Sequence, residues 1–168
     1  MIILRKISIA LLFGIVGCVG DNKDKSASHT EENLEIGKLA LKDLNDHVIN
    51  LKEYKGKIIF INFWATWCKP CLEEMPSIQK AQEILKDKSI IFLFASDELA
   101  EQIENFKSEH DYNFNYVRTE NLAELNILAL PTTFIFDING KLVFNEMGYR
   151  KWDDKTNIDL ILKIAKTE

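Results

Sequence analysis

Beyond about residue 35, apolar residues gather in short runs that charged and polar segments separate. Residues 58–63, 90–95 and 134–136 are rich in β-branched and aromatic side chains, and such nearly continuous apolar runs predict strands that are covered on both faces of a sheet. Apolar positions recur at helical spacing after Cys71 and again in residues 158–165.

Two pairs of apolar runs flank polar turns and predict β-hairpins. Residues 39–41 and 48–51 enclose one polar turn near the start of the domain. An Asn-Gly pair, which is a strong signal for a two-residue hairpin turn, separates residues 134–136 from 142–144. The remaining patterns predict a helix over residues 99–108 capped by Ser96 or Asp97, an edge strand at 116–117, a helix over 121–126 and a C-terminal helix around 158–165.

Cys68 and Cys71 stand between the strand pattern of residues 58–63 and a helical pattern that runs to about Leu85. Two cysteines at this spacing can close a small disulfide ring in the first turn of the helix. Helix N-termini carry unpaired N–H groups and partial positive charge, which favour a thiolate over a thiol. A free thiol with a pKa of about 8.5 is only ~3% ionised at neutral pH, whereas one with a pKa of about 7 is half ionised. The sequence therefore predicts that Cys68 is a competent nucleophile.

A C-x-x-C pair can also form half of a zinc site, but four-ligand zinc needs two further side chains. Beyond the pair the chain offers only Cys18, His29, His47 and His110, and these are not spaced as ligands. We therefore favour the redox interpretation. A lipoprotein that uses the cysteine pair to hold copper or zinc stays as the alternative function, and a structural lipoprotein with an inert disulfide is a further one.

The order of strand, Trp-Cys-x-Pro-Cys motif and helix resembles the thioredoxin superfamily. The stretch KGKIIFINFWATWCKPCLEEMP is similar, almost residue for residue, to the TlpA/ResA/CcmG branch of bacterial extracytoplasmic thiol-disulfide oxidoreductases, and the similarity covers roughly residues 35–168. This resemblance implies a thioredoxin-like α/β fold, in which a central mixed sheet is flanked by helices on both faces and preceded by an N-terminal β-hairpin extension. It also implies that Lys69 and Pro70 tune the redox potential, and that Trp67 offers substrates an aromatic surface beside Cys68.

Pro131 lies just before the strand of residues 134–136. Proline cannot donate a hydrogen bond to a sheet, and cis-proline occurs in tight non-helical turns. By the thioredoxin resemblance, Pro131 is the cis-proline that packs against the C-x-x-C motif, and an ordinary trans proline is the alternative. The same resemblance implies that the backbone around Leu130 is free to pair with an extended substrate segment, and that Thr132 is among the substrate-binding residues.

Glu74 is predicted to lie on the buried face of the helix that begins at the cysteines. At about 100° per residue it falls within one apolar arc, which contains Cys71, Met75, Ile78, Ala81 and Leu85. A buried carboxylate has a raised pKa and suits proton exchange near neutral pH.

The family resemblance also bears on Glu74. Many thioredoxins carry a buried aspartate where Asn62 stands, and an amide cannot take a proton. ResA-like proteins are similar in having a glutamate where Glu74 stands, so the resemblance assigns proton transfer to Glu74. The alternative is that Glu74 points to solvent near the helix N-terminus, and Pro76 should kink the helix.

Residues 1–18 have the pattern of a targeting segment, with a small basic region before an apolar stretch. Residues 15–18 resemble a bacterial lipobox, in which Cys18 is lipidated; an ordinary secretory signal or an uncleaved anchor is the alternative. Residues 19–34 are polar and charged, which predicts a flexible tether before one domain over residues 35–168. We therefore expect a lipid-anchored protein of the bacterial cell envelope that faces the periplasm or extracytoplasmic side, where disulfides persist.

The chain of 168 residues carries 21 basic and 26 acidic residues, giving a formal net charge of −5. It shows no basic patch in its sequence, which argues against nucleic acid as a partner and against electrostatic docking to anionic lipid. We predict a monomer with no cofactor beyond a redox-active Cys68–Cys71 disulfide. The predicted function is thiol-disulfide exchange on exported proteins. The TlpA/ResA resemblance favours the reducing direction, for example on apocytochrome c cysteines, with recharging by a membrane thiol-disulfide carrier.

Overall fold

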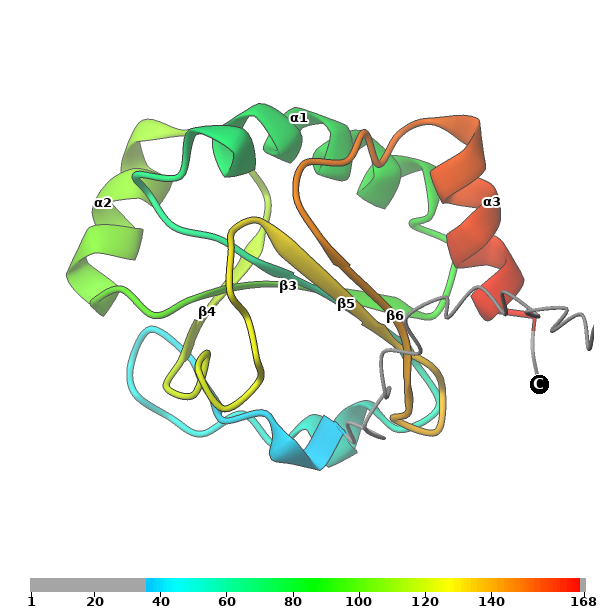
Figure 1. The fold of residues 1–168 in the computed structure, drawn as a ribbon, viewed down its shortest axis with the longest axis horizontal. Helices are drawn as coiled ribbons and strands as arrows, with labels where there is room; N and C mark the ends of the chain where they lie inside the picture. The colour runs from blue at the N-terminus through cyan, green and yellow to red at the C-terminus, as the bar shows by residue number, and fades with distance from the viewer. Residues whose placement is uncertain (1–35, 167–168) are drawn as a thin grey trace, which may run out of the picture. The chain divides into compact units, whose positions relative to one another are not determined.

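The computed structural model describes residues 36–166, so the predicted signal peptide, most of the tether and Cys18 lie outside the described residues. Strands form a sheet in the order β1-β4-β3-β2-β5-β6 (Figure 1). They are β1 (Leu41–Lys42), β2 (Ile58–Phe63), β3 (Ile90–Ser96), β4 (Asn115–Thr119), β5 (Thr132–Phe136) and β6 (Leu142–Met147). β2, β3 and β4 run parallel, whereas β1, β5 and β6 are antiparallel to their neighbours, which confirms the predicted mixed sheet.

The α-helices of the described residues are α1 (Lys69–Ile84), α2 (Ala100–Glu109) and α3 (Lys155–Ile164). Their apolar side chains pack into a single core cluster on one face of the sheet, seen at the top of Figure 1. The β2–α1–β3 and β3–α2–β4 connections step across the sheet in the same direction, and right-handed connections then put both helices on the same face. None of the described helices is both long and apolar enough to cross a membrane.

The other face of the sheet also carries helices, as expected, but in the described residues these are short 3-10 helices. It is covered by the 3-10 helices η1 (Ile36–Lys38) and η2 (Leu51–Tyr54) and by the turns around Leu125, which share a second core cluster with it. Every residue of β2 is buried, and its side chains alternate between the two clusters: Phe60 belongs to the first, Ile61 to the second. Burying such a side chain contributes roughly 1.5–3 kcal/mol, so the strand that leads directly to the cysteines is anchored on both sides.

The predicted N-terminal hairpin forms only as a tight turn. Lys42 and Val48 make one antiparallel bridge, and β1 pairs instead with β4. The second arm does not continue as a strand, because Asn50 caps η2 and its side chain accepts the Lys52 N–H. With β1 on its outer side, β4 is an inner strand and not the predicted edge strand.

The predicted cap of α2 was wrong. The helix begins after Leu99, whose N–H donates to the side-chain oxygen of Gln102 at 3.1 Å. Asp97 is exposed, and the Ser96 hydroxyl accepts the Glu98 N–H at 3.2 Å. Ser96 is therefore the last residue of β3, and Asp97 lies in the turn between β3 and α2.

Two predictions concern the segments before and after β5: a helix over residues 121–126 and a hairpin turn at Asn-Gly. Residues 121–126 form turns instead of the predicted helix, and the buried Leu125 holds this segment against the second core cluster. The predicted hairpin joins β5 to β6, but its loop is longer than two residues: the Asp137 N–H donates to the Lys141 carbonyl, and the Gly140 N–H donates to the Asp137 carbonyl. Its Gly140 has a φ of 80°, and a Cβ added there would lie 2.7 Å from the Ile36 side chain, so the turn requires glycine.

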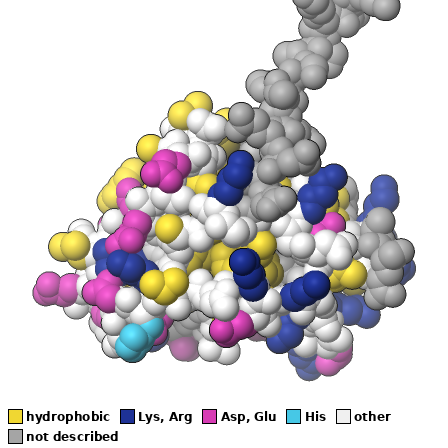
Figure 2. All heavy atoms as spheres, turned by 90° about the horizontal axis from the view of Figure 1, so that it is seen from below, with side chains coloured by type: hydrophobic (Ala, Val, Ile, Leu, Met, Phe, Trp, Pro, Cys, Tyr) yellow, Lys and Arg dark blue, Asp and Glu magenta, His cyan; other side chains and the backbone are white. Residues whose placement is uncertain are grey.

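Figure 2 shows the molecule from the side of η1 and η2, where lysine and arginine side chains lie beside hydrophobic ones. A pocket of about 180 Å³ lies between η2 and the β5–β6 turn, and Lys52, Lys55 and Lys57 are among its lining residues. These lysines come from one short stretch of the sequence, and Asp137 lines the same pocket. The described lining residues include no cysteine or histidine, and the pocket lies at the start of β2, away from the cysteines at its other end.

Candidate active site

The cysteine pair lies where the chain passes from β2 to α1. Cys68 is the N-cap residue of α1, and its Sγ accepts a hydrogen bond from the Cys71 N–H at 3.3 Å. The two sulfurs form a disulfide, with the Cα atoms 5.3 Å apart. Pro70 fits the first turn because N–H groups there have no partner within a helix. The structure thus brings the two cysteines together at a helix N-terminus, where negative charge on sulfur is favoured.

The two sulfurs differ in their access to solvent. Cys71 is fully buried, whereas Cys68 keeps 4% of its surface exposed. Trp67 is 73% exposed, so its indole lies on the surface beside Cys68. Lys69 is exposed and forms only a long ion pair with Glu73, at 3.9 Å, which adds little stability. A substrate that approaches the site therefore meets Cys68 before Cys71.

The peptide bond between Leu130 and Pro131 is cis, as predicted. β5 begins at the next residue, and its register pairs Thr132 with Phe63 at the end of β2. Pro131 therefore lies at the same edge of the sheet as the cysteines. The backbone N–H and C=O of Leu130 have no hydrogen-bond partner in the described part of the chain.

Thr132 is placed in the turn and not on the surface. Its side chain is almost fully buried, and its hydroxyl donates to the Ala129 carbonyl at 2.6 Å. Leu130 is partly buried and packs against both core clusters. Of the three predicted substrate-binding residues, Trp67 presents its side chain to solvent and Leu130 presents its unpaired backbone, whereas Thr132 shapes the turn that contains Pro131.

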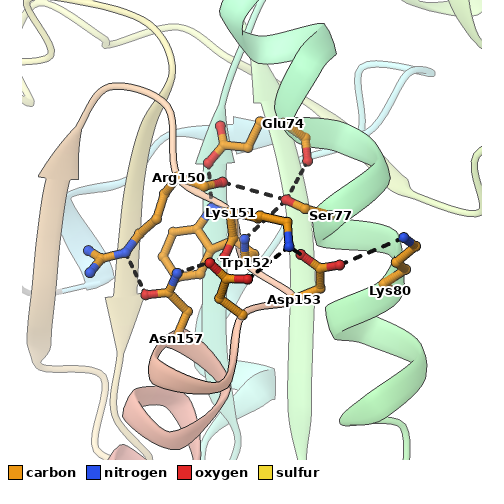
Figure 3. A network of polar contacts seen from close by, with 9 residues as sticks. Glu74, Ser77, Lys80, Arg150, Lys151, Trp152, Asp153 and Asn157 are labelled. Atoms are coloured by element: carbon orange, nitrogen blue, oxygen red, sulfur yellow. Dashed lines mark hydrogen bonds and ion pairs between the residues drawn. The ribbon is translucent and has the colours of Figure 1, made fainter.

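Glu74 lies one turn after Cys71 and is fully buried, so the alternative of a solvent-facing glutamate is excluded. The Trp152 indole N–H donates to Oε1 of Glu74, and Asn62 Nδ2 donates to Oε2 at 3.4 Å (Figure 3 shows Glu74 with Trp152). Burial raises the pKa of Glu74 to about 7, while the hydrogen bonds from Trp152 and Asn62 act in the opposite sense. A carboxyl group that is half protonated near neutral pH can both accept and donate a proton.

Asn62 connects Glu74 to the neighbouring strand. Its Nδ2 also donates to Thr133 Oγ1 at 3.0 Å, on β5. The prediction of a hydrogen-bonded core asparagine is confirmed, with the addition that one of its partners is Glu74. Because an amide takes no proton in this pH range, Glu74 is the proton-exchanging member of this pair.

Glu98 is a site residue that the sequence analysis missed. Its carboxylate is almost buried and accepts the Thr66 N–H at 2.7 Å, the Thr66 hydroxyl at 2.6 Å and the Ser96 hydroxyl at 3.0 Å. Thr66 stands two residues before Cys68, so Glu98 fixes the loop that presents the nucleophile. The sequence could have indicated this position of Glu98. Parallel strands end at the same edge of a sheet, so an acidic residue just after β3 lies near the loop that follows β2.

The chain matches known proteins over the region that carries these features. Residues 34–145 match the AhpC/TSA family. The thiol-disulfide oxidoreductase ResA of Bacillus thuringiensis subsp. konkukian is 34% identical over 143 residues, which cover 80% of this chain and 83% of that protein. The chain belongs to the AhpC/TSA family of thioredoxin-like proteins.

Further relatives agree with this assignment. The thioredoxin-like protein YneN of Bacillus subtilis is 36% identical over 161 residues, covering 89% of this chain and 95% of that protein. A solved structure described as a thiol:disulfide interchange protein DsbE, from Chlorobium tepidum, superposes with a TM-score of 0.69 at 22% identity and covers 79% of this chain and 96% of its own; this likeness concerns the fold alone. With ResA as a relative and a Cys68–Cys71 disulfide in place, the chain is a thiol-disulfide oxidoreductase with a thioredoxin-like fold.

The metal-holding alternative gains no support from side-chain placement. Within residues 36–166, no three histidine, cysteine, aspartate or glutamate side chains lie close enough together to hold a metal ion.

Replacing Glu98 by glutamine tests its role in holding the loop. We expect Glu98→Gln to lower the free energy of unfolding at pH 7 by about 1–3 kcal/mol, because the donors of Thr66 and Ser96 lose an ionised acceptor. Urea denaturation of the oxidised protein measures the change. Glu101→Gln, on the exposed surface of α2, is the matched control and should change stability by less than about 0.5 kcal/mol. Equal effects of the two substitutions would contradict the anchoring role.

The raised pKa of Glu74 predicts a specific pH dependence of stability. Between its ordinary value of 4.5 and its folded value of about 7, the folded protein holds a proton that the unfolded chain has released. Stability should therefore fall as pH rises through this window, by about 3 kcal/mol for this group. Denaturation of the oxidised protein at a series of pH values between these limits measures the fall. Glu74→Gln should remove this fall, whereas Glu73→Gln at the neighbouring exposed position should retain it; a fall of equal size in both variants would contradict the assignment.

Proposed function

We propose that this oxidoreductase reduces disulfides of exported proteins, with the cysteines of apocytochrome c as one substrate. The observation that carries the proposal is the fully buried Glu74, one helical turn from Cys71, with a pKa of about 7. In a reductant, the buried Cys71 must lose its proton before its sulfur can close the disulfide. A carboxylate at this distance along the helix is placed to take that proton.

The first step belongs to Cys68. As a thiolate stabilised at the N-terminus of α1, its sulfur attacks one sulfur of a substrate disulfide. The substrate S–S bond breaks, and its other sulfur leaves as a thiolate. The product is a mixed disulfide between Cys68 and the substrate. Cys68 suits this step because it is the cysteine of the pair that keeps some exposed surface.

The second step belongs to Cys71 and Glu74. The Cys71 thiol gives its proton to the Glu74 carboxylate, and the Cys71 sulfur attacks the Cys68 sulfur. The mixed disulfide breaks, the second substrate sulfur leaves as a thiolate and takes up a proton, and the Cys68–Cys71 bond closes. Two electrons have then passed from the dithiol to the substrate.

The surface around Cys68 supports an extended polypeptide as the substrate. The unpaired N–H and C=O of Leu130 provide a donor and an acceptor for a substrate backbone beside the cis-proline. Trp67, the neighbour of Cys68 in the sequence, adds an exposed aromatic surface. Lys69 and Pro70, between the two sulfurs, are proposed to set the potential within the roughly 150 mV range that C-x-x-C proteins span.

Location and direction rest on the relatives and on the leader. The ResA relatives carry the name thiol-disulfide oxidoreductase, and the TlpA/ResA branch that the motif resembles works outside the cytoplasm. The lipobox pattern that ends at Cys18 supports a lipid anchor on that side of the membrane. Since each turnover oxidises the cysteine pair, the proposal requires a membrane thiol-disulfide carrier that returns it to the dithiol.

Capturing substrates as mixed disulfides tests the proposal. In Cys71→Ala the mixed disulfide of the first step cannot be resolved, so we expect covalent complexes between Cys68 and exported proteins in the native host. Non-reducing electrophoresis followed by identification of the bound chains measures this. Cys68→Ala is the matched control and should trap no substrate, because the remaining sulfur is buried.

The identity of the captured chains distinguishes apocytochrome c from a wider range of substrates, and the reduction potential distinguishes a reductant from an oxidant. Apocytochrome c among the captured chains supports the haem-attachment substrate, whereas a spread of unrelated secreted proteins contradicts it and indicates general disulfide repair. A potential near that of thioredoxin, about −270 mV, supports a reductant; one near that of DsbA, about −120 mV, contradicts the direction.

Glu74→Gln tests the proton step. We expect this substitution to change the pH dependence of thiol reactivity in the reduced protein, because Cys71 loses its proton acceptor while the shape of the site is kept. Alkylation rates measured against pH report the change. Glu73→Gln, at an exposed position of the same helix turn, should leave the profile unchanged. An unchanged profile in Glu74→Gln would dismiss the proton role of Glu74.

A further inference from the structure

The loop between β6 and α3 is bound to α1 directly after the cysteine motif (Figure 3). Ser77 on α1 is the central contact: its hydroxyl donates to the Glu74 carbonyl at 2.8 Å and accepts the backbone N–H of Trp152 at 3.0 Å. An ion pair between Lys80 and Asp153, at 3.7 Å, joins the same loop to the next turn of α1. The loop is therefore fixed relative to Glu74 at more than one point.

The Trp152 ring is held in one orientation by its neighbours. It is almost fully buried and makes edge-to-face contacts with Phe60 and Phe144, with ring centroids 4.7 and 5.8 Å apart. The Arg150 guanidinium lies over the same ring, 5.6 Å from its centroid. Because a buried indole ring in such contacts cannot turn freely, the direction of its N–H is set, and that direction is toward Oε1 of Glu74.

We propose that Trp152 is a positioning residue of the redox site, whose indole N–H holds the Glu74 carboxylate in place one helical turn from Cys71 and favours its ionised form. The physical reason is that an indole N–H can only donate, so it stabilises a carboxylate and offers nothing to the proton of a carboxylic acid. The inference rests on the proton role proposed for Glu74. It adds that this role depends on a loop far from the cysteines in the sequence.

The other groups that face Glu74 are few in the described residues. Asn62 on β2 is uncharged, and the cysteine pair on α1 does not titrate while it is oxidised. Arg150, on the same loop as Trp152, is the charged neighbour, and it also favours the ionised form of Glu74. Its guanidinium is held by Glu146 and by Asn157, so it is expected to keep its place when Trp152 is replaced by a smaller aromatic residue.

The test follows the titration of Glu74 in the oxidised full-length chain. Trp152→Phe keeps an aromatic ring against Phe60 and Phe144 but removes the N–H. We expect the pKa of Glu74 to rise from about 7 by about one pH unit, because a hydrogen bond to an ionised group is worth that much or more. Isotope-edited NMR of the Glu74 carboxyl carbon measures the titration directly.

The chain contains a matched control for the loss of an indole. Trp64 is also fully buried in the same core cluster, but its Nε1 has no hydrogen-bond partner among the described residues. Trp64→Phe should therefore leave the titration of Glu74 unchanged. Should Trp152→Phe fail to fold, benzothienylalanine at position 152 keeps the shape of the indole and replaces its N–H by sulfur, and the same rise is expected.

The outcomes separate this inference from the proposed function. A rise of the pKa of Glu74 in the position-152 variants, without one in Trp64→Phe, supports the positioning role. An unchanged or lowered pKa in those variants, or an equal rise in Trp64→Phe, overturns it. If Glu74→Gln leaves thiol reactivity unchanged, the proton role fails, while the Glu74 titration in the oxidised chain still decides whether Trp152 holds the carboxylate.

Discussion

The redox end of this molecule depends on the burial of one carboxyl group, that of Glu74. A carboxylate in a protein core is costly unless donors replace the water that it loses. Here the donors come from Asn62 on β2 and from Trp152 on the loop before α3. The proton affinity of Glu74 is therefore defined only when strand, loop and helix are docked together. Under the proposed proton role of Glu74, packing far from the cysteines would take part in their chemistry, because it influences whether this carboxyl group is protonated at neutral pH.

Two buried glutamates flank the cysteine pair, and their surroundings give them different tasks. Glu98 accepts hydrogen bonds from the Thr66 backbone, the Thr66 hydroxyl and the Ser96 hydroxyl, so its oxygens are engaged in holding the loop before Cys68. Glu74 is more deeply buried, and this burial raises its pKa to about 7. The same side chain therefore anchors a loop in one place, and in the other it is the group for which we propose a proton-exchanging role.

Local pattern and motif predicted what is close in sequence. The strand that ends at Phe63, the cysteines at the start of α1 and the buried side of α1 follow from patterns of neighbouring residues. The cis bond at Pro131 was implied by the resemblance to the thioredoxin superfamily. The partners that complete the site were not predictable in this way. Trp152 stands 78 residues from Glu74, and Glu98 stands 32 residues from Thr66, so only the folded sheet brings them together. Which face of the sheet carries the α-helices was not predictable for a similar reason: the direction in which a connection crosses the sheet is a property of topology and leaves no local pattern.

Asn62 shows why an amide is the better neighbour for such a glutamate. Its Nδ2 lies 3.4 Å from the Glu74 carboxylate. An aspartate at this position, as in many thioredoxins, would put two carboxyl groups at that separation, where like charges strongly disfavour ionisation of both. The pair would then titrate as a unit, and the proton would belong to neither residue alone. An amide carries no charge at any relevant pH and donates to the ionised form of Glu74. Substituting the amide for the acid thus leaves the site with a single proton position, and places it on the helix that carries Cys71.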